Sequence, residues 1–293
     1  MKAQLKKIYS ALPFKKEFYS LLKKVWTPPE KTYRHFHFKG VFTVKIDEDH
    51  SFKIRHYGYE VENHIFWTGI TGRYESESIK LWIELCKNST VIVDVGANTG
   101  LFSLVAKSLN PHAKVYAFEP VKRVTDKLKA NVALNGYDII CIEKALSNFD
   151  GEAKIYDTHH EHTYSVTINK NRNLPETPVF ETVIPTQRLA TFIEQNNIQH
   201  INLIKLDVET HEPEVLAGMG EYLERYRPSL LVEILNDEVA ARIEPLLKGI
   251  PYLYFNIHAV NKPRLVEKLS QSDHYNFLIC TRDVAVHLGL INS

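Results

Sequence analysis

A short glycine-containing segment, Asp94–Gly100, combines residue types that suit the binding of a small charged molecule. It follows an apolar, β-branched run, which predicts a place at a strand's carboxyl end, where open α/β sheets bind ligands. Gly96 and Gly100 let the backbone turn tightly. Asp94 only accepts hydrogen bonds when ionised, so it suits an ammonium group or a water network and would repel a pyrophosphate. Asn98 replaces the second glycine of a dinucleotide-binding loop, which favours a nucleoside without phosphates.

The ends of the next two predicted strands supply contacts for such a nucleoside. Glu119 lies 25 residues after Asp94, and a carboxylate at this point can accept hydrogen bonds from both ribose hydroxyls. Leu146, at the third strand end, could pack on an adenine ring. The combination favours S-adenosylmethionine as the cofactor. The predicted cofactor-binding residues are Asp94, Gly96, Asn98, Thr99, Gly100, Glu119, Pro120 and Leu146.

A second polar cluster, Lys205–Glu212, follows the fourth predicted strand. Its carboxylates could bind a substrate hydroxyl, and His211 could take up the proton near neutral pH. Asp207 and Glu209 could instead only stabilise the turn from strand to helix. Glu233 lies inside an apolar strand and needs a polar partner or cleft, so it is also a candidate. The predicted catalytic residues are His211, Asp207, Glu209 and Glu233.

Metal binding has two candidate locations in the sequence. His159, His160 and His162 could ligate zinc together with a neighbouring carboxylate, but adjacent histidines are more typical of a polar hairpin tip, and we favour that interpretation. Asp207, Glu209 and Glu233 could hold Mg²⁺, so metal dependence stays open. We assign no metal site.

The elements that must position these residues alternate between strand and helix from residue 91 onward. This order predicts a doubly wound, Rossmann-like α/β fold with right-handed crossovers. An antiparallel hairpin is expected over 153–156 and 164–168, and Thr186 is expected to cap a helix through Asn196. Residues 31–68 alternate like strands, and 1–30 have helical spacing, so we divide the chain into an extension over 1–68 and a main domain over 69–293. Seven strands are predicted, the last antiparallel, at 91–95, 114–118, 139–145, 201–208, 230–235, 252–257 and 276–281.

The composition constrains location and partners. A net charge of +1 gives no general attraction to nucleic acid. No apolar stretch is long enough to span a bilayer, no secretory signal is evident, and the three cysteines have no metal or disulfide spacing, so we expect a cytoplasmic protein. Residues 1–26 carry seven lysines and one acid, Glu17. Packing of this arm on the body or on a partner subunit is favoured over contact with an anionic membrane surface.

Four motifs in this order resemble those of FkbM-family methyltransferases: Val93–Gly100, Phe118–Pro120, Ala145–Ser147 and Ile204–Glu212. The resemblance implies a class I methyltransferase fold and S-adenosylmethionine-dependent O-methylation of a saccharide or other small secondary metabolite. It also implies that Glu75 lies near the methionine part of the cofactor. One departure concerns the acceptor side: the family commonly has Gly after Asp-Val-Glu, and this chain has Thr210 followed by His211.

Two other functions are compatible with the same sheet. One is a nicotinamide-dependent oxidoreductase, against which the Asp94 loop argues. The other is a non-catalytic binding protein that retains the fold, against which the polar cluster at 207–212 argues. The sequence does not identify the methyl acceptor, the general base or the oligomeric state.

Overall fold

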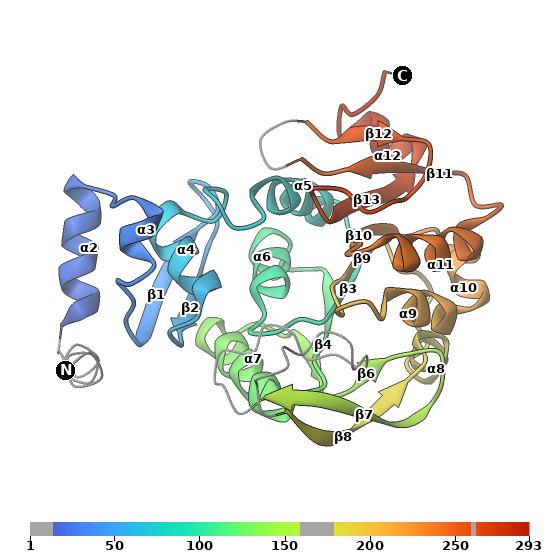
Figure 1. The fold of residues 1–293 in the computed structure, drawn as a ribbon, viewed down its shortest axis with the longest axis horizontal. Helices are drawn as coiled ribbons and strands as arrows, with labels where there is room; N and C mark the ends of the chain where they lie inside the picture. Colours follow the sequence, from blue (N-terminus) through green and yellow to red (C-terminus); the bar gives the residue numbers. More distant parts are fainter. Residues whose placement is uncertain (1–13, 159–178, 259–261, 293) are drawn as a thin grey trace. The chain divides into compact units, whose positions relative to one another are not determined.

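A computed structural model describes residues 14–158, 179–258 and 262–292. The chain forms two compact units, which divide between Ser76 and Glu77 (Figure 1). Among these residues, no helix is long and apolar enough to cross a membrane. The histidines at 159, 160 and 162 and the expected strand at 164–168 lie outside the described residues.

The first unit is a small α/β module. Its elements are α2 (Lys15–Val25), α3 (Glu30–Tyr33), the antiparallel hairpin β1 (Gly40–Lys45) and β2 (Ser51–His56), and α4 (Glu60–Thr68). The predicted strands are present, but the β-like interpretation of 31–68 is wrong for α4. Glu62 to Trp67 are all buried, so polar and apolar residues alike face the interior here, and the sequence lacks the contrast between a polar exposed face and an apolar buried face that indicates a helix.

The second unit is built on one large sheet, and its first helix, α5 (Ser76–Lys87), begins at the boundary. The strand order is β12-β11-β13-β10-β9-β3-β4-β5. β3, β4, β5, β9 and β10 run parallel, whereas β13 is antiparallel to both of its neighbours. The strands are β3 (Val91–Val95), β4 (Lys114–Phe118), β5 (Ile140–Ile142), β9 (Leu203–Leu206), β10 (Ser229–Glu233), β11 (Tyr252–Asn256), β12 (Arg264–Val266) and β13 (Asn276–Thr281).

The predicted doubly wound fold and its antiparallel final strand are confirmed. Each of the seven expected strands is present, and β12 adds an eighth at the sheet edge. The connecting helices are α6 (Leu101–Leu109), α7 (Lys122–Asn135), α8 (Leu189–Gln195), α9 (Glu212–Met219), α10 (Glu221–Tyr226), α11 (Asp237–Leu247) and α12 (Arg282–His287).

A second, three-stranded sheet branches off after β5. Its order is β6 (Ala145–Leu146), β8 (Val179–Gln187), β7 (Gly151–Thr158). The expected helix cap at Thr186 is corrected here, whereas the expected hairpin partner of residues 153–156, at 164–168, lies outside the described residues. The strand paired with β7 is β8, and Thr186 belongs to that strand, pairing with Ala145 and Gly151, so the following helix begins only at Leu189.

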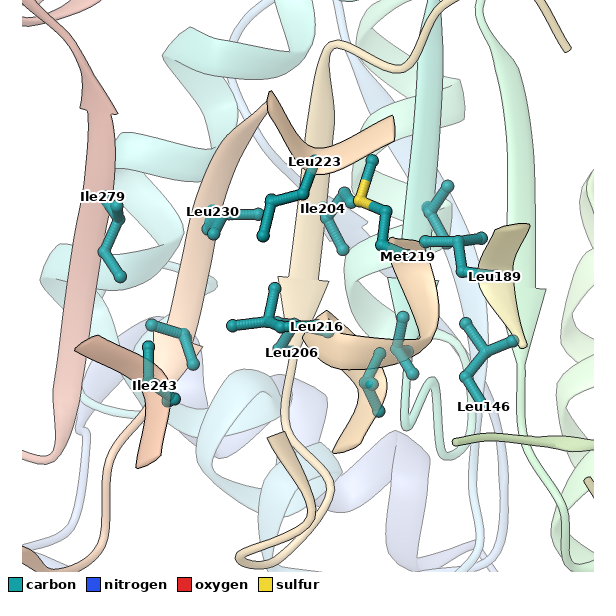
Figure 2. Close-up of a cluster of buried hydrophobic side chains, with 14 of the residues drawn as sticks. Leu146, Leu189, Ile204, Leu206, Leu216, Met219, Leu223, Leu230, Ile243 and Ile279 are labelled. Carbon is teal, nitrogen blue, oxygen red and sulfur yellow. The ribbon is translucent and has the colours of Figure 1, made fainter. Parts of the chain in front are cut away.

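One face of the large sheet packs against α8 to α11. Figure 2 shows sheet residues such as Ile204, Leu230 and Ile279 facing Leu216 of α9 and Ile243 of α11, with each of these five side chains at most 2% exposed. Successive side chains in a strand alternate between faces, so the intervening residues of β3 and β9 face the other way. This alternation decides which strand residues are core and which can reach the α6 side.

The packing of the sheet against α8 to α11 predicts how substitutions on this face change stability. Ile279→Ala should lower the free energy of unfolding by about 2–5 kcal/mol, because it removes a fully buried side chain and leaves a cavity. The matched control is Ile140→Ala, at a position that is 40% exposed, and it should cost less than about 1 kcal/mol. Urea unfolding of both variants measures the difference, and equal losses would contradict this packing.

Candidate functional site

The polar residues that the sequence singles out gather at one edge of the large sheet. Because β3, β4, β5, β9 and β10 are parallel, their carboxyl ends share that edge. The chain leaves β3 toward β4 and later returns to β9 on its other side, which makes the space beyond β3 and β9 the switch point of the sheet. Ligands bind at such points in open α/β sheets.

The Asp94–Gly100 loop folds over the end of the neighbouring strand. The amides of Gly96 and Ala97 both donate to the carbonyl of Phe118, at 3.0 and 2.9 Å. Asn131 of α7 donates its side-chain amide to the carbonyl of the buried Thr99, at 2.8 Å. Asn98 adopts a left-handed conformation with φ of 49°. The loop is thus held by β4 and α7 independently of any ligand.

Gly96 brings this loop against the end of β9. Its φ is +79°, and a Cβ at this position would overlap the backbone carbonyl oxygen of Asp207. The amide of Asp207 in turn donates to the carbonyl of Val95, at 3.2 Å. The loop predicted to bind the cofactor and the loop predicted to bind the substrate are therefore in direct backbone contact.

Asp94 lies on the α6 side of the sheet and is 1% exposed. Its Oδ2 accepts from Ser103 of α6 at 2.6 Å, whereas Oδ1 is buried and accepts no hydrogen bond from the described residues. Burial raises the pKa of this carboxyl, and the nearby Lys205 opposes the shift. A buried acceptor with one unused oxygen fits a donor that a ligand or a water brings to the site.

Glu119 occupies the predicted position at the end of β4. Its Oε2 accepts from the amide of Asn98 at 3.1 Å, and its Oε1 accepts from the amide of Val121 at 3.0 Å. Burial raises its pKa to about 7. Each carboxylate oxygen has two lone pairs, so acceptor capacity remains for hydroxyl donors. Pro120, next in the chain, is half-buried.

Leu146, at the end of the third strand, lies in the core. It is 2% exposed and belongs to the cluster beneath α8 and α9 (Figure 2). The following residue, Ser147, is fully buried and directs its hydroxyl to His211. Leu146 therefore supports this strand end from inside, and its contact with an adenine ring stays a prediction.

The loop after β9 is strained and is organised around a buried carboxyl. Glu209 and Thr210 both have positive φ, 57° and 79°, which is costly for a β-branched residue. The carboxyl of Glu212 is fully buried and accepts from the amides of Val208, at 3.0 Å, and Thr210. Burial raises the pKa of Glu212 to about 7. The backbone hydrogen bonds to Glu212 hold the strained conformation.

His211 sits at the start of α9 and is 7% exposed. Its Nε2 lies 3.0 Å from Ser147 Oγ, and its Nδ1 lies 3.5 Å from a carboxylate oxygen of Glu214. Glu214 also forms an ion pair with Arg242 of α11. Burial lowers the pKa of His211, against the opposing effect of Glu214. The imidazole is thus neutral and oriented at both nitrogens.

The remaining predicted site residues are Asp207, Glu209, Glu233 and Glu75. Asp207 forms an ion pair with Lys205 at 2.8 Å. Glu233 is the last residue of β10 and half-buried. Asp207, Glu209 and Glu233 do not form a group with metal-ligand spacing among the described residues. Glu75 belongs to the first unit and has a φ of 40°, so its proximity to the cofactor stays a prediction.

Comparison with known proteins agrees with this geometry. The family described as "Methyltransferase FkbM domain" matches residues 94–252. The chain belongs to this family. The resemblance inferred from four motifs is confirmed, and with it a methyltransferase domain that uses S-adenosylmethionine. The match begins at Asp94, so it spans the glycine loop, Glu119 and the strained loop after β9.

Three curated relatives are similar to this FkbM-domain chain. Methyltransferase sdnD of Sordaria araneosa is 30% identical over 44% of this chain and 60% of its own length. Hexuronic acid methyltransferase AglP of Haloferax volcanii is 27% identical over 59% of this chain and 65% of its own length. 2-O-methyltransferase NoeI of Sinorhizobium fredii is 28% identical over 48% and 62%. The chain thus spans 60–65% of these relatives' lengths.

Sequence reasoning missed three residues that organise this FkbM-domain site. Ser103 binds Asp94 from α6. Lys205 is 4% exposed, pairs with Asp207 and lies 4.4 Å from the ring centre of Phe102. Asn131 holds the loop at Thr99. Of these three, only Lys205 could have been predicted from the sequence, because a lysine inside the apolar strand Leu203–Leu206 requires a polar or charged partner.

The contact between Gly96 and Asp207 can be tested with a matched pair of substitutions. Gly249→Ala, at a φ of +90° with open space around the new Cβ, should cost about 1–2 kcal/mol of unfolding free energy from backbone strain alone. Gly96→Ala should cost at least about 2 kcal/mol more, because its Cβ meets the backbone of Asp207. Thermal or urea unfolding compares the two, and equal costs would show that the two loops do not meet.

Proposed function

We propose that this protein transfers a methyl group from S-adenosylmethionine to a hydroxyl of a saccharide or other small secondary metabolite. The observation that supports this most directly is the position of the Asp94–Gly100 loop. It lies at the switch point of the sheet, with Asp94 and Glu119 ending two adjacent parallel strands.

The residues around the loop fit this cofactor. Asp94 keeps one buried oxygen available for a donor from the methionine part or its bound water. Glu119 retains lone pairs for the ribose hydroxyls, and the backbone of Gly96 and Asn98 borders the same space. When bound, S-adenosylmethionine supplies a methyl group that its sulfonium makes electrophilic. The protein then has to align the acceptor and remove its proton.

His211 is the proposed base. Burial lowers its pKa, so the ring is neutral at pH 7 and can accept a proton. A hydrogen on Nδ1, facing Glu214, leaves the lone pair of Nε2 for Ser147. The acceptor hydroxyl would take the place of the Ser147 hydroxyl at this nitrogen. Asp207, Glu209 and Glu233 are proposed to orient the acceptor.

The acceptor class is inferred from chemistry and from the relatives' names. AglP is named a hexuronic acid methyltransferase and NoeI a 2-O-methyltransferase; the first name indicates a sugar-derived acceptor and the second indicates methylation on oxygen. Carboxylates such as Asp207 and Glu209 suit a polyhydroxylated acceptor, because they accept hydrogen bonds from its hydroxyls. A methyl-transfer assay on a panel of glycans tests this class against a non-catalytic role.

Glu119→Ala should weaken binding of S-adenosylhomocysteine by about 2–4 kcal/mol, through loss of two hydrogen bonds to a charged group. The pKa of Glu119 is about 7, so in the wild type the carboxyl becomes protonated as the pH falls below that value. Affinity should therefore decrease from pH 8 to pH 6, and this dependence should be absent in the variant. Calorimetry measures both effects.

The control for this substitution is Glu84→Ala, at a carboxylate that is 54% exposed on α5. It should leave affinity unchanged. Unchanged affinity in Glu119→Ala would remove Glu119 from the cofactor site. A thermal shift with NAD but none with S-adenosylhomocysteine would instead favour an oxidoreductase.

His211→Ala should reduce turnover by about 10²- to 10⁴-fold, the usual contribution of a general base, with little change in cofactor affinity. Ser147→Ala serves as the comparison, because it removes the neighbour of Nε2 but keeps the imidazole. It should retain most of the turnover. The acidic limb of the pH–rate profile should disappear only in His211→Ala, and full turnover by that variant would exclude His211 as the base.

A further inference from the structure

Helix α2 in the first unit carries an exposed apolar stripe. Phe14, Phe18, Leu21 and Val25 are 76%, 62%, 64% and 83% exposed. Phe18, Leu21 and Val25 are spaced three and four residues apart, which places them on one face of the helix, and Phe14 is the N-cap residue directly before it. Isolated exposed apolar residues are common, but a continuous row of large ones marks an interaction surface.

The opposite face of α2 is fixed to the first unit. Tyr19 is 4% exposed and stacks on Phe36, with ring centres 5.4 Å apart. It also contacts Trp67 at 5.5 Å. Lys23 donates to the carbonyl of Phe66 and lies 5.4 Å from the centre of its ring. Because these contacts set the rotation of the helix, the stripe cannot turn into the core of its own unit.

Helix α2 is positively charged overall. It carries four lysines and one acid, Glu17, whereas the whole chain has a net charge of only +1. At about 100° per residue, Lys15 falls on one side of the stripe, and Lys24 and Glu17 fall on the other. Trp26 follows the helix and is 50% exposed, and tryptophan favours the interface between water and lipid.

We propose that α2 is a docking helix that lies on the surface of an anionic lipid bilayer, with Phe14, Phe18, Leu21 and Val25 entering the headgroup boundary. An apolar face bordered by lysines is the composition of helices that bind in this way. A second copy of the chain fits this surface poorly, because α2 helices that pair through the stripe would bring their lysines together. The occupant that the charges favour is therefore negative.

Vesicle co-sedimentation of the full chain tests this proposal. The probes are vesicles of phosphatidylcholine alone and of phosphatidylcholine with an equal amount of phosphatidylglycerol. We expect binding to the anionic vesicles only, weakening as sodium chloride is raised. The double variant Phe18→Ser and Leu21→Ser should lower the partition coefficient by at least about tenfold, and Lys15→Gln with Lys24→Gln by about fivefold to tenfold.

The matched control removes exposed apolar side chains elsewhere. Val183 and Leu265 are 57% and 51% exposed on β8 and β12, so Val183→Ser with Leu265→Ser should leave vesicle binding unchanged. The two serine double variants alter exposed positions, and unchanged thermal unfolding verifies that they fold. Equal binding to neutral vesicles, no binding, or an equal loss in the control would overturn the proposal.

Sedimentation equilibrium without lipid tests the alternative occupant of the stripe, a second copy of the chain. A dimer that the Phe18→Ser and Leu21→Ser variant converts to a monomer would assign the stripe to a second copy and overturn the lipid proposal. Vesicle binding needs no methyl transfer, so failure of the proposed catalytic function would leave this result unaffected.

Discussion

The close approach of two backbone segments at the switch point governs the functional edge of this protein. Gly96 has no side chain, and the carbonyl of Asp207 occupies the space that one would fill. The loop between β3 and α6 and the loop between β9 and α9 are therefore packed as one body. Hydrogen bonds from the first loop to Phe118 extend this body to β4. The positions of the residues proposed to bind cofactor and acceptor are thus set by the same few backbone contacts.

Buried charge gives this edge its chemical character. Asp94, Glu119 and Glu212 are each less than 9% exposed, and burial raises the pKa of all three. Lys205 pairs with Asp207 and also opposes the shift at Asp94. Removing carboxylates from water is costly unless opposite charge or hydrogen bonds compensate. This excess of hydrogen-bond acceptors supports the proposed binding of a cationic cofactor and a polyhydroxylated acceptor.

Much of this arrangement could be predicted from the sequence, and the exceptions have physical reasons. Local patterns predicted the strands that end near Asp94, Glu119 and Asp207. Parallel strands separated by helices bring their carboxyl ends to one edge, so the gathering of these three residues could be predicted too. Ser103 and Asn131 act across the fold and leave no local pattern. The pairing of β7 with β8 joins segments separated in the chain, which no short-range signal specifies. Helix α4 escaped detection because it is buried on all sides.

The loop after β9 also bears on how new acceptor specificities can arise. Its left-handed residues, Glu209 and Thr210, keep their shape because the amides around them bond to the buried carboxyl of Glu212. A change at one of residues 208–212 should therefore lose the compensation that the others supply. Loop grafting between relatives should transfer this block whole, including His211, which lies beside Ser147.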